Sequence, residues 1–288
     1  MSATSIISQN TFSLCGHGDP YADCQELLYF GCKREHGYFN SAKGKAYVKV
    51  VRRNCGRLRC PKCLDKVTSN KARKIKQRLK AWKVDRLTIK HIIVSPDADE
   101  TNGMDYPEIK KKAYNLMKRC GVLGGVMVVH PFRCNDFHRY EKPGLHFHIL
   151  GYGNVRGNKV KETFEKEKWI IKNKGKRKSV FVTAKYILGH CGVSEKYSTI
   201  NWFGCCSYNK LRVKINDKHP GCIYCGEELL QMAWRPTKFK PPDGNEFLDE
   251  PRNWTYFKLH KVRHFRCYYI EIDIQDCFPK YNNKTEEE

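Results

Sequence analysis

The sequence lacks the features that would direct the chain into or through a membrane. Residues 1–14 contain neither a basic start nor a continuous apolar stretch, so they do not resemble a secretory signal. No run approaches the roughly 18 apolar residues that a membrane-spanning helix needs. The sequence has no internal repeat. It also has no Walker-type glycine loop, which argues against a helicase domain in the same chain. We therefore expect a cytoplasmic protein without a membrane partner.

Acidic residues are scarce relative to basic ones. The chain has 54 Lys and Arg but only 30 Asp and Glu, which gives a net charge of +24, and the excess is spread along the sequence. Such a charge favours polyanionic partners, because each neutralised phosphate releases condensed counterions. A structural protein of ribosomes or chromatin would carry a similar charge. The charge therefore indicates a nucleic-acid partner and does not indicate a chemistry.

Cysteine, in contrast, is abundant, with 15 residues. In a chain without a secretory signal, grouped cysteines indicate metal binding more often than disulfides. Cys55, Cys60 and Cys63 offer three thiolates within a tight turn, and either Cys32 or His36 upstream can complete a tetrahedral Zn²⁺ site. The sequence therefore predicts a structural zinc ion near residue 60.

A second group of cysteines resembles a zinc knuckle. It has the spacing Cys222-Ile-Tyr-Cys225-Gly, and its partners would be Cys205 and Cys206. Adjacent cysteines seldom bind one ion together comfortably, so the second zinc site is the weaker prediction. The alternative is a set of small buried thiols.

The pattern of the chain predicts an α+β protein in three consecutive regions. We expect an N-terminal zinc-binding module (residues 1–85), a central domain (86–200) and a C-terminal region with the zinc knuckle (201–288). The N-terminal module should contain a basic helix at residues 66–82. The central domain alternates strands at 87–95, 124–133 and 145–152 with helices at 106–120, 159–171 and 180–190. Residues 172–178 are expected to form a basic turn.

The most informative motif is a pair of histidines in the third strand of the central domain. Side chains two residues apart in a strand project from the same face, so His146 and His148 lie side by side while Leu145, Phe147 and Ile149 face the opposite way. Two parallel imidazoles make half of a divalent metal site. The same alternation also fits a half-buried strand that binds nothing.

A metal site that leaves a position for substrate needs at least a third protein ligand. His130 lies near the pair if residues 124–133 pair antiparallel with residues 145–152. His190 is the other candidate, and Glu141 is a weaker one because it falls in the connection before the strand. The sequence does not rank His130 above His190.

Tyr186 and His190 are four residues apart in the predicted helix at 180–190, so they share one face, with Lys185 beside them. The alternative is a half-buried aromatic residue followed by a histidine that caps the helix end.

These motifs, taken in order, resemble those of the HUH endonucleases, and in particular the rolling-circle replication initiators of archaeal plasmids and viruses. The resemblance covers about residues 30–225 and rests on Cys-Pro-Lys-Cys at 60–63, His-Pro-Phe-Arg at 130–133, Gly-Leu-His-Phe-His at 144–148 and Tyr-Ile-Leu-Gly-His at 186–190. It implies a ferredoxin-like, or RRM-like, antiparallel sheet with helices on one side and the metal on one face.

The resemblance also implies an activity. Tyr186 would nick single-stranded origin DNA, keep the 5′ phosphate as a phosphotyrosine ester and release a 3′ hydroxyl, and the same chemistry would rejoin strands. Mg²⁺ or Mn²⁺ would assist, Lys185 would stabilise the phenolate or the phosphate, and host helicase and polymerase would be recruited. Family members with two tyrosines place them three or four residues apart, whereas Val182 and His190 flank Tyr186 here. The chain is therefore expected to be a single-tyrosine enzyme, encoded by a plasmid or virus of a prokaryotic or archaeal cell.

Two alternatives stay open. A single-strand transposase would share the domain and chemistry and differ in its DNA. A non-enzymatic zinc-ribbon protein that binds nucleic acid would use the paired histidines only structurally.

Overall fold

The computed structural model describes residues 7, 11–32, 39–40, 45–82, 87–134, 140–213, 221–222, 226–234, 268–273 and 277–279. The chain divides into two compact units, one of residues 1–21 and 56–216 and one of residues 22–55 and 217–288. This differs from the three consecutive regions expected from the sequence, because the second unit combines segments from both ends of the chain. Within the described residues, no helix is both long and apolar enough to span a bilayer.

The first unit is built on a five-stranded antiparallel sheet. Its strands lie in the order β10-β6-β7-β5-β8, and the chain runs through β5, α3, β6, β7, α4 and β8 in succession. The bounds are β5 Lys90–Ser95, β6 Val122–Cys134, β7 Tyr140–Gly153, β8 Ile170–Lys176 and β10 Ile200–Gly204. The predicted α+β class with antiparallel strands is confirmed.

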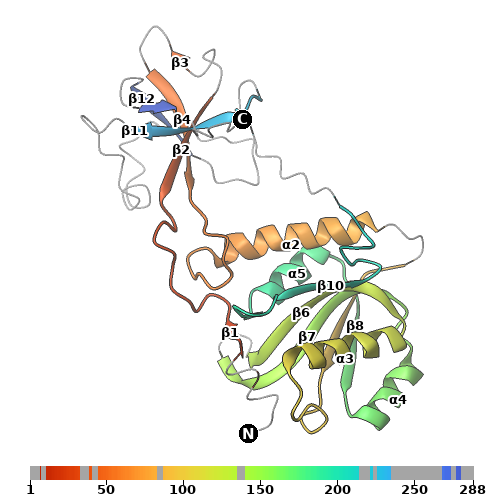
Figure 1. Ribbon diagram of the computed structural model, residues 1–288. Helices are drawn as coiled ribbons and strands as arrows, with labels where there is room; N and C mark the ends of the chain where they lie inside the picture. Colours follow the sequence, from red (N-terminus) through yellow and green to blue (C-terminus); the bar gives the residue numbers. More distant parts are fainter. Residues whose placement is uncertain are drawn as a thin grey trace, which may run out of the picture. The chain divides into compact units, whose positions relative to one another are not determined.

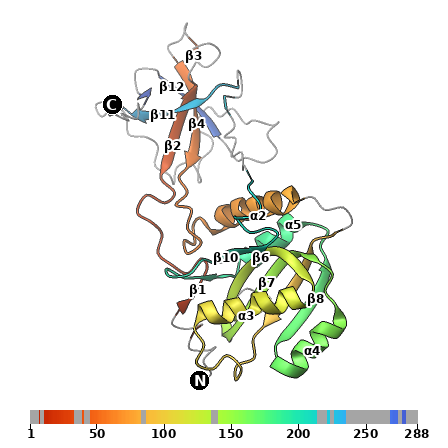
Figure 2. The same ribbon diagram turned by 45° about the vertical axis from the view of Figure 1, so that its right-hand side comes forward.

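Helices cover both faces of this sheet (Figure 1, Figure 2). On one side lie α3 (Tyr106–Arg119) and α4 (Gly157–Glu167), and on the other lie α2 (Leu64–Ala81) and α5 (Val180–Leu188). The two-residue strands β1 (Ser13–Leu14) and β9 (Gly192–Val193) pair with each other beside the sheet. The expectation that helices lie on one side only is therefore wrong, since α2 and α5 pack over the second face.

The apolar core of this unit lies between the sheet and α3. Asp105 caps α3 through a full capping box with Glu108, and the apolar positions of the helix then face the sheet. The opposing strands contribute their inward side chains, including Phe147 and Ile149, which are fully buried. The alternation expected for the third strand is thus confirmed, because its apolar residues enter this core.

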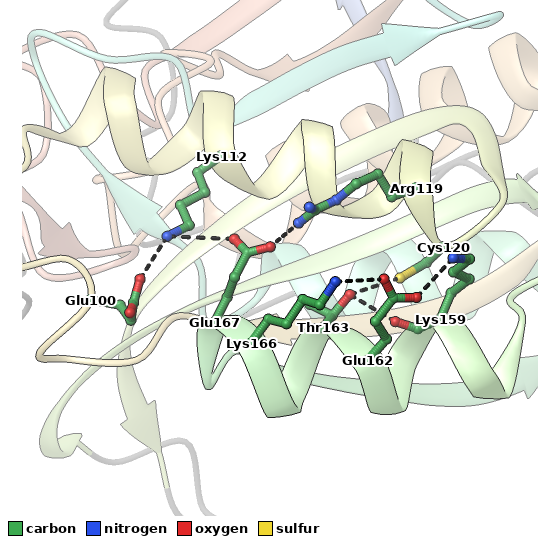
Figure 3. Close-up of polar contacts among 9 residues, drawn as sticks. All are labelled: Glu100, Lys112, Arg119, Cys120, Lys159, Glu162, Thr163, Lys166 and Glu167. Carbon is green, nitrogen blue, oxygen red and sulfur yellow. Dashed lines mark hydrogen bonds and ion pairs between the residues drawn. The ribbon is translucent and has the colours of Figure 1, made fainter.

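Figure 3 shows how α4 is joined to α3 by polar contacts. Glu167 pairs with Arg119 and with Lys112, and Lys112 also reaches Glu100 at 3.0 Å. The Thr163 hydroxyl lies 3.8 Å from the thiol of Cys120. Ion pairs of this exposure contribute little stability each, so the contacts orient α4 more than they hold it.

Helix α2 is anchored by a buried arginine. Arg78 is 5 % exposed and donates hydrogen bonds to the carbonyl oxygens of Cys206, Ser207 and Leu211 at 3.0, 3.0 and 2.6 Å. The Tyr152 hydroxyl of β7 donates to the Leu79 carbonyl at 2.8 Å. The basic helix expected at residues 66–82 therefore exists, and it belongs to the unit that carries the histidine strands.

The second unit contains a separate antiparallel sheet in the order β12-β4-β2-β11-β13, with β3 paired to β4. The strands are β2 Leu27–Cys32, β3 Phe39–Asn40, β4 Lys45–Arg52, β11 Leu229–Trp234, β12 Tyr268–Asp273 and β13 Cys277–Pro279. Residues 235–267 lie outside the described part of the chain.

Candidate metal and tyrosine site

Three histidines converge on the sheet face that carries α2 and α5. Strands β6 and β7 pair antiparallel with His130 directly opposite His146 and Val128 opposite His148. Directly opposed residues project from the same face, and so do residues two apart in one strand. The antiparallel pairing assumed from the sequence is therefore confirmed, and it places His130 beside both members of the pair.

The three imidazoles form a compact group in which His130 and His148 are buried and His146 is half-buried. Ring centroids are 5.1 Å apart for His130 and His146, 4.2 Å for His130 and His148, and 5.1 Å for His146 and His148. One ring nitrogen from each lies within 4.8 Å of the others. Such a spacing allows all three nitrogens to approach one divalent ion after small side-chain adjustments.

The site keeps these imidazoles neutral. Burial lowers the pKa of His130 well below its usual value, and the neighbouring His148, His190 and His146 lower it further. Burial also lowers the pKa of His146 to about 4. The pKa of His148 falls well below its usual value for the same reason, with a further contribution from His146. Neutral imidazoles are the form that binds metal, so burial favours the charge state that ligation requires at neutral pH.

Unpaired nitrogens support the same conclusion. His130 is completely buried, and neither of its ring nitrogens has a hydrogen-bond partner in the described part of the chain. The nearby backbone of Ile187 acts to raise the pKa of His130, but burial outweighs it. An unpaired buried polar atom costs about 1–3 kcal/mol. His146 donates from Nδ1 to the Gly144 carbonyl at 2.8 Å, which leaves the lone pair on Nε2. The donor set therefore fits a divalent metal.

One histidine near the site has no counterpart in the sequence reasoning. His91 of β5 is buried, and its Nε2 lies 2.8 Å from Nδ1 of His148. The Nη2 of Arg177, after β8, lies 2.8 Å from Nδ1 of His91. In the sequence, His91 is marked only by its position directly before the apolar run Ile92-Ile93-Val94. Nothing in the neighbouring residues links it to His148.

Helix α5 brings the tyrosine to the histidines. The Ser179 side chain caps the helix by accepting from the Val182 N–H, and the helix ends at Leu188 before Gly189. The ring of Tyr186 lies 4.6 Å from that of His190, which in turn lies 4.5 Å from that of His130. Tyr186 is 55 % exposed. Tyr186 and His190 therefore lie together as expected, although His190 lies in the turn after the helix and not on the helix itself. The phenol is accessible to a large substrate.

His190 lies beside the three-histidine group without joining it. Its ring centroid is 6.0 Å from that of His148, and the set of nitrogens within 4.8 Å of one another contains only His130, His146 and His148. The geometry therefore favours His130 over His190 as the third ligand. The side chain of Glu141 lies outside the described ones.

A hollow of about 390 Å³ opens beside the tyrosine, between α2 and α5. Lys185 lines it and pairs with Asp65 of α2, with 2.7 Å between Nζ and Oδ1. Apolar side chains complete the wall around these polar groups, namely those of Leu64, Phe181 and Val182.

Four cysteines form a second group that could hold a metal ion such as zinc. Cys24, Cys55, Cys60 and Cys63 have sulfur atoms within 4.8 Å of one another. Tetrahedral ligation with Zn–S distances near 2.3 Å needs sulfur separations of about 3.8 Å. Cys63 directly precedes α2, and Cys60 and Cys63 are almost fully buried.

The fourth cysteine differs from the prediction. Strands β2 and β4 pair antiparallel with Leu27 opposite Arg52, so the chain just before β2 meets the chain just after β4, and this pairing places Cys24 near Cys55. Cys32 lies at the other end of β2, five residues after Leu27, and five residues of strand span about 17 Å. The prediction of Cys32 as fourth ligand is therefore wrong, and His36 lies outside the described residues.

The described members of the predicted second zinc site, Cys205, Cys206 and Cys222, do not form a group of ligands. The sulfur atoms of Cys205 and Cys206 are 3.8 Å apart, but neither these two nor Cys222 belongs to a described group of three or more ligands. Burial raises the pKa of the Cys206 thiol to about 12, which opposes thiolate formation in the absence of a metal. Cys225 lies outside the described residues.

Comparison with known proteins finds no matching family model, no matching curated protein and no matching solved structure. The arrangement of residues is thus the basis for any functional conclusion.

Proposed function

We propose that the protein is a metal-dependent DNA endonuclease and strand transferase of the HUH type, which initiates rolling-circle replication through Tyr186. The observation that carries this proposal is the convergence of three neutral imidazoles, two of them buried and one half-buried, with an accessible tyrosine. His130, whose ring nitrogens have no hydrogen-bond partner in the described part of the chain, contacts His190, and His190 contacts Tyr186.

The topology supports a ferredoxin-like core for this activity. The succession β5-α3-β6-β7-α4-β8 with the order β6-β7-β5-β8 matches the βαββαβ pattern of that fold. Many activities occur on ferredoxin-like folds, so the topology is compatible with the proposal and the site must carry it.

The chemistry follows from the side chains. The Tyr186 oxygen forms a bond to the phosphorus of a single-stranded DNA, the bond from phosphorus to O3′ breaks, the phenol loses its proton and O3′ gains one. A tyrosine with an ordinary pKa near 10 is about one part in a thousand ionised at neutral pH, so it needs help. Mg²⁺ or Mn²⁺ bound by His130, His146 and His148 would supply electrostatic stabilisation at the phosphate. Lys185, held near the hollow by Asp65, adds a positive charge beside Tyr186.

A covalent adduct tests the proposal. The protein is incubated with 5′- and 3′-labelled single-stranded oligonucleotides and Mg²⁺ or Mn²⁺, and a denaturing gel reports protein attached to the new 5′ end, so that the adduct carries the 3′ label and not the 5′ label. Tyr186→Phe should abolish the adduct while DNA binding persists. Tyr208→Phe is the matched control, because Tyr208 is also exposed and is stacked on Arg78 away from the histidines.

Two outcomes would contradict the proposal. An undiminished adduct in Tyr186→Phe refutes the nucleophile. DNA binding without any adduct, together with Mn²⁺ binding that survives His146→Ala and His148→Ala in the zinc-loaded protein, indicates the non-enzymatic binding protein. Plasmid origins and transposon ends, offered as separate substrates, distinguish an initiator from a transposase.

A further inference from the structure

A chain of two short polar contacts connects β8 to the histidine group. Arg177 Nη2 lies 2.8 Å from His91 Nδ1, and His91 Nε2 lies 2.8 Å from His148 Nδ1. The rings of His91 and His148 are stacked with centroids 5.0 Å apart. His148 belongs to the proposed metal ligands, so the contacts link a half-buried arginine to the proposed metal site.

The direction of both hydrogen bonds is fixed by the arginine. A guanidinium only donates, so Nδ1 of His91 must accept. Because Nδ1 accepts this hydrogen bond, the ring proton of His91 sits on Nε2. That N–H donates to His148 Nδ1. A neutral His148 then carries its own proton on Nε2, and its Nε2 lone pair is absent.

Metal binding at His148 Nε2 requires the opposite arrangement. The lone pair must be on Nε2 and the proton on Nδ1, which then donates to His91 Nε2. His91 in turn must carry its proton on Nδ1, the atom that Arg177 contacts. Two donors cannot face each other at 2.8 Å, so the contact with Arg177 must break. His91 and His148 together carry two ring protons both before and after the metal binds. The proton on His91 Nε2 passes to His148 Nδ1. The proton on His148 Nε2 goes to solvent, and His91 Nδ1 takes one from solvent.

We propose that Arg177 is a phosphodiester-binding residue that is held on His91 in the metal-free protein and is released toward the DNA backbone when a divalent ion binds His148. This inference rests on the proposed function, because it takes the histidines as metal ligands and single-stranded DNA as the substrate. Metal loading and DNA binding are thereby coupled through one side chain.

The surroundings of Arg177 suit this role. Its Nε is buried without a hydrogen-bond partner among the described residues, so the contact with His91 leaves part of the guanidinium unused. Strand β8 forms the edge of the sheet, and its exposed lysines at 172, 174 and 176 precede the arginine. A planar guanidinium can donate two parallel hydrogen bonds to a phosphate, which a lysine cannot.

Proton positions give the first test. In the zinc-loaded full-length protein, long-range ¹H–¹⁵N correlations report which ring nitrogen of each histidine carries hydrogen. The metal-free protein should show His91 and His148 both protonated at Nε2, and Mg²⁺ should move both protons to Nδ1. Protonation of His148 at Nδ1 before Mg²⁺ is added would overturn the proposal.

Metal affinity gives the second test, measured by Mn²⁺ titration without DNA. Arg177→Met removes the opposing donor and should tighten Mn²⁺ binding by about tenfold relative to Lys174→Met. Lys174→Met is the matched control, because Lys174 also acts electrostatically on His91 and His148 without bonding to either. Equal effects of the two substitutions would mean that only charge matters and would overturn the proposal.

DNA binding gives the third test, in a Tyr186→Phe background with an oligothymidylate probe. Arg177→Met should reduce the slope of log affinity against log salt by about 0.7 with Mg²⁺ present and leave it unchanged without Mg²⁺. Lys178→Met, which removes an exposed neighbouring charge, should reduce the slope equally in both states. A loss from Arg177→Met that is independent of Mg²⁺ contradicts the coupling. Absence of a covalent adduct in the parent protein would instead contradict the proposed function, so the two failures are distinguishable.

Discussion

Acid should destabilise the protein through the buried histidines, and His146→Gln isolates the contribution of one of them. The pKa of His146 is lowered from 6.5 to about 4 in the folded chain, chiefly by burial. Below pH 6.5 the unfolded chain takes up a proton that the folded chain refuses, so stability is fully present above that pH and is lost as pH falls. The loss for one such imidazole is about 1.4 kcal/mol at pH 5.5 and about 2.6 kcal/mol at pH 4.5.

Urea unfolding followed by circular dichroism measures this loss without added Mg²⁺ or Mn²⁺. Glutamine does not titrate in this range and can still donate to the Gly144 carbonyl, so the stability difference between parent and His146→Gln should shift by about 1.2 kcal/mol between pH 7 and pH 5.5. Zinc loss at the cysteines affects both proteins and cancels in the difference. His17→Gln, at an exposed position outside the group, is the control. A stability difference for His146→Gln that is independent of pH would refute the reasoning.

Three further predictions concern the rest of the molecule. Cys60→Ala should abolish binding of one zinc ion, measured by metal analysis and a chelator assay. It should also reduce the helical circular dichroism signal, because metal ligation contributes about 10 kcal/mol to the folding of such sites. Cys32→Ala should leave the zinc content unchanged. Arg78→Met should lower the free energy of unfolding by about 3 kcal/mol in urea titrations because it leaves buried carbonyls unpaired, whereas Arg73→Met on the exposed face should change it by less than about 0.5 kcal/mol. Asp105→Ala should lower it by about 1 kcal/mol through loss of the helix cap, and an unchanged unfolding midpoint would contradict the capping role.

Local patterns were sufficient wherever the interaction is local. Residues two apart in a strand share a face whatever surrounds them, so the pairing of His146 with His148 followed from spacing. Tyr186 and His190 come together as their spacing indicated, although His190 lies in the turn after the helix. The cap at Asp105 is also a short-range feature. Each of these depends on backbone geometry within a few residues.

The path of the chain after α4 was predicted less well. The helix expected to reach residue 171 ends at Glu167, where Lys168 adopts a left-handed conformation, and the expected basic turn is largely strand β8. Its lysines conceal the strand in the sequence, because an edge strand with exposed charges lacks the apolar alternation of a buried one. Pairing with β5 supplies the order that its own residues do not indicate.

The sequence by itself determined the chemistry that local geometry can arrange: two imidazoles on one strand face, a tyrosine and a histidine close together at the end of one helix, and three cysteines in one turn. Only the tertiary structure decided what completes each group. Cys24 comes near Cys55 because β2 and β4 pair in one register. His91 reaches His148 across 57 residues of sequence, and Arg177 reaches His91 across 86, because β5 pairs with both β7 and β8. Contacts between distant segments depend on strand order and register, which the periodicity of a single segment does not encode.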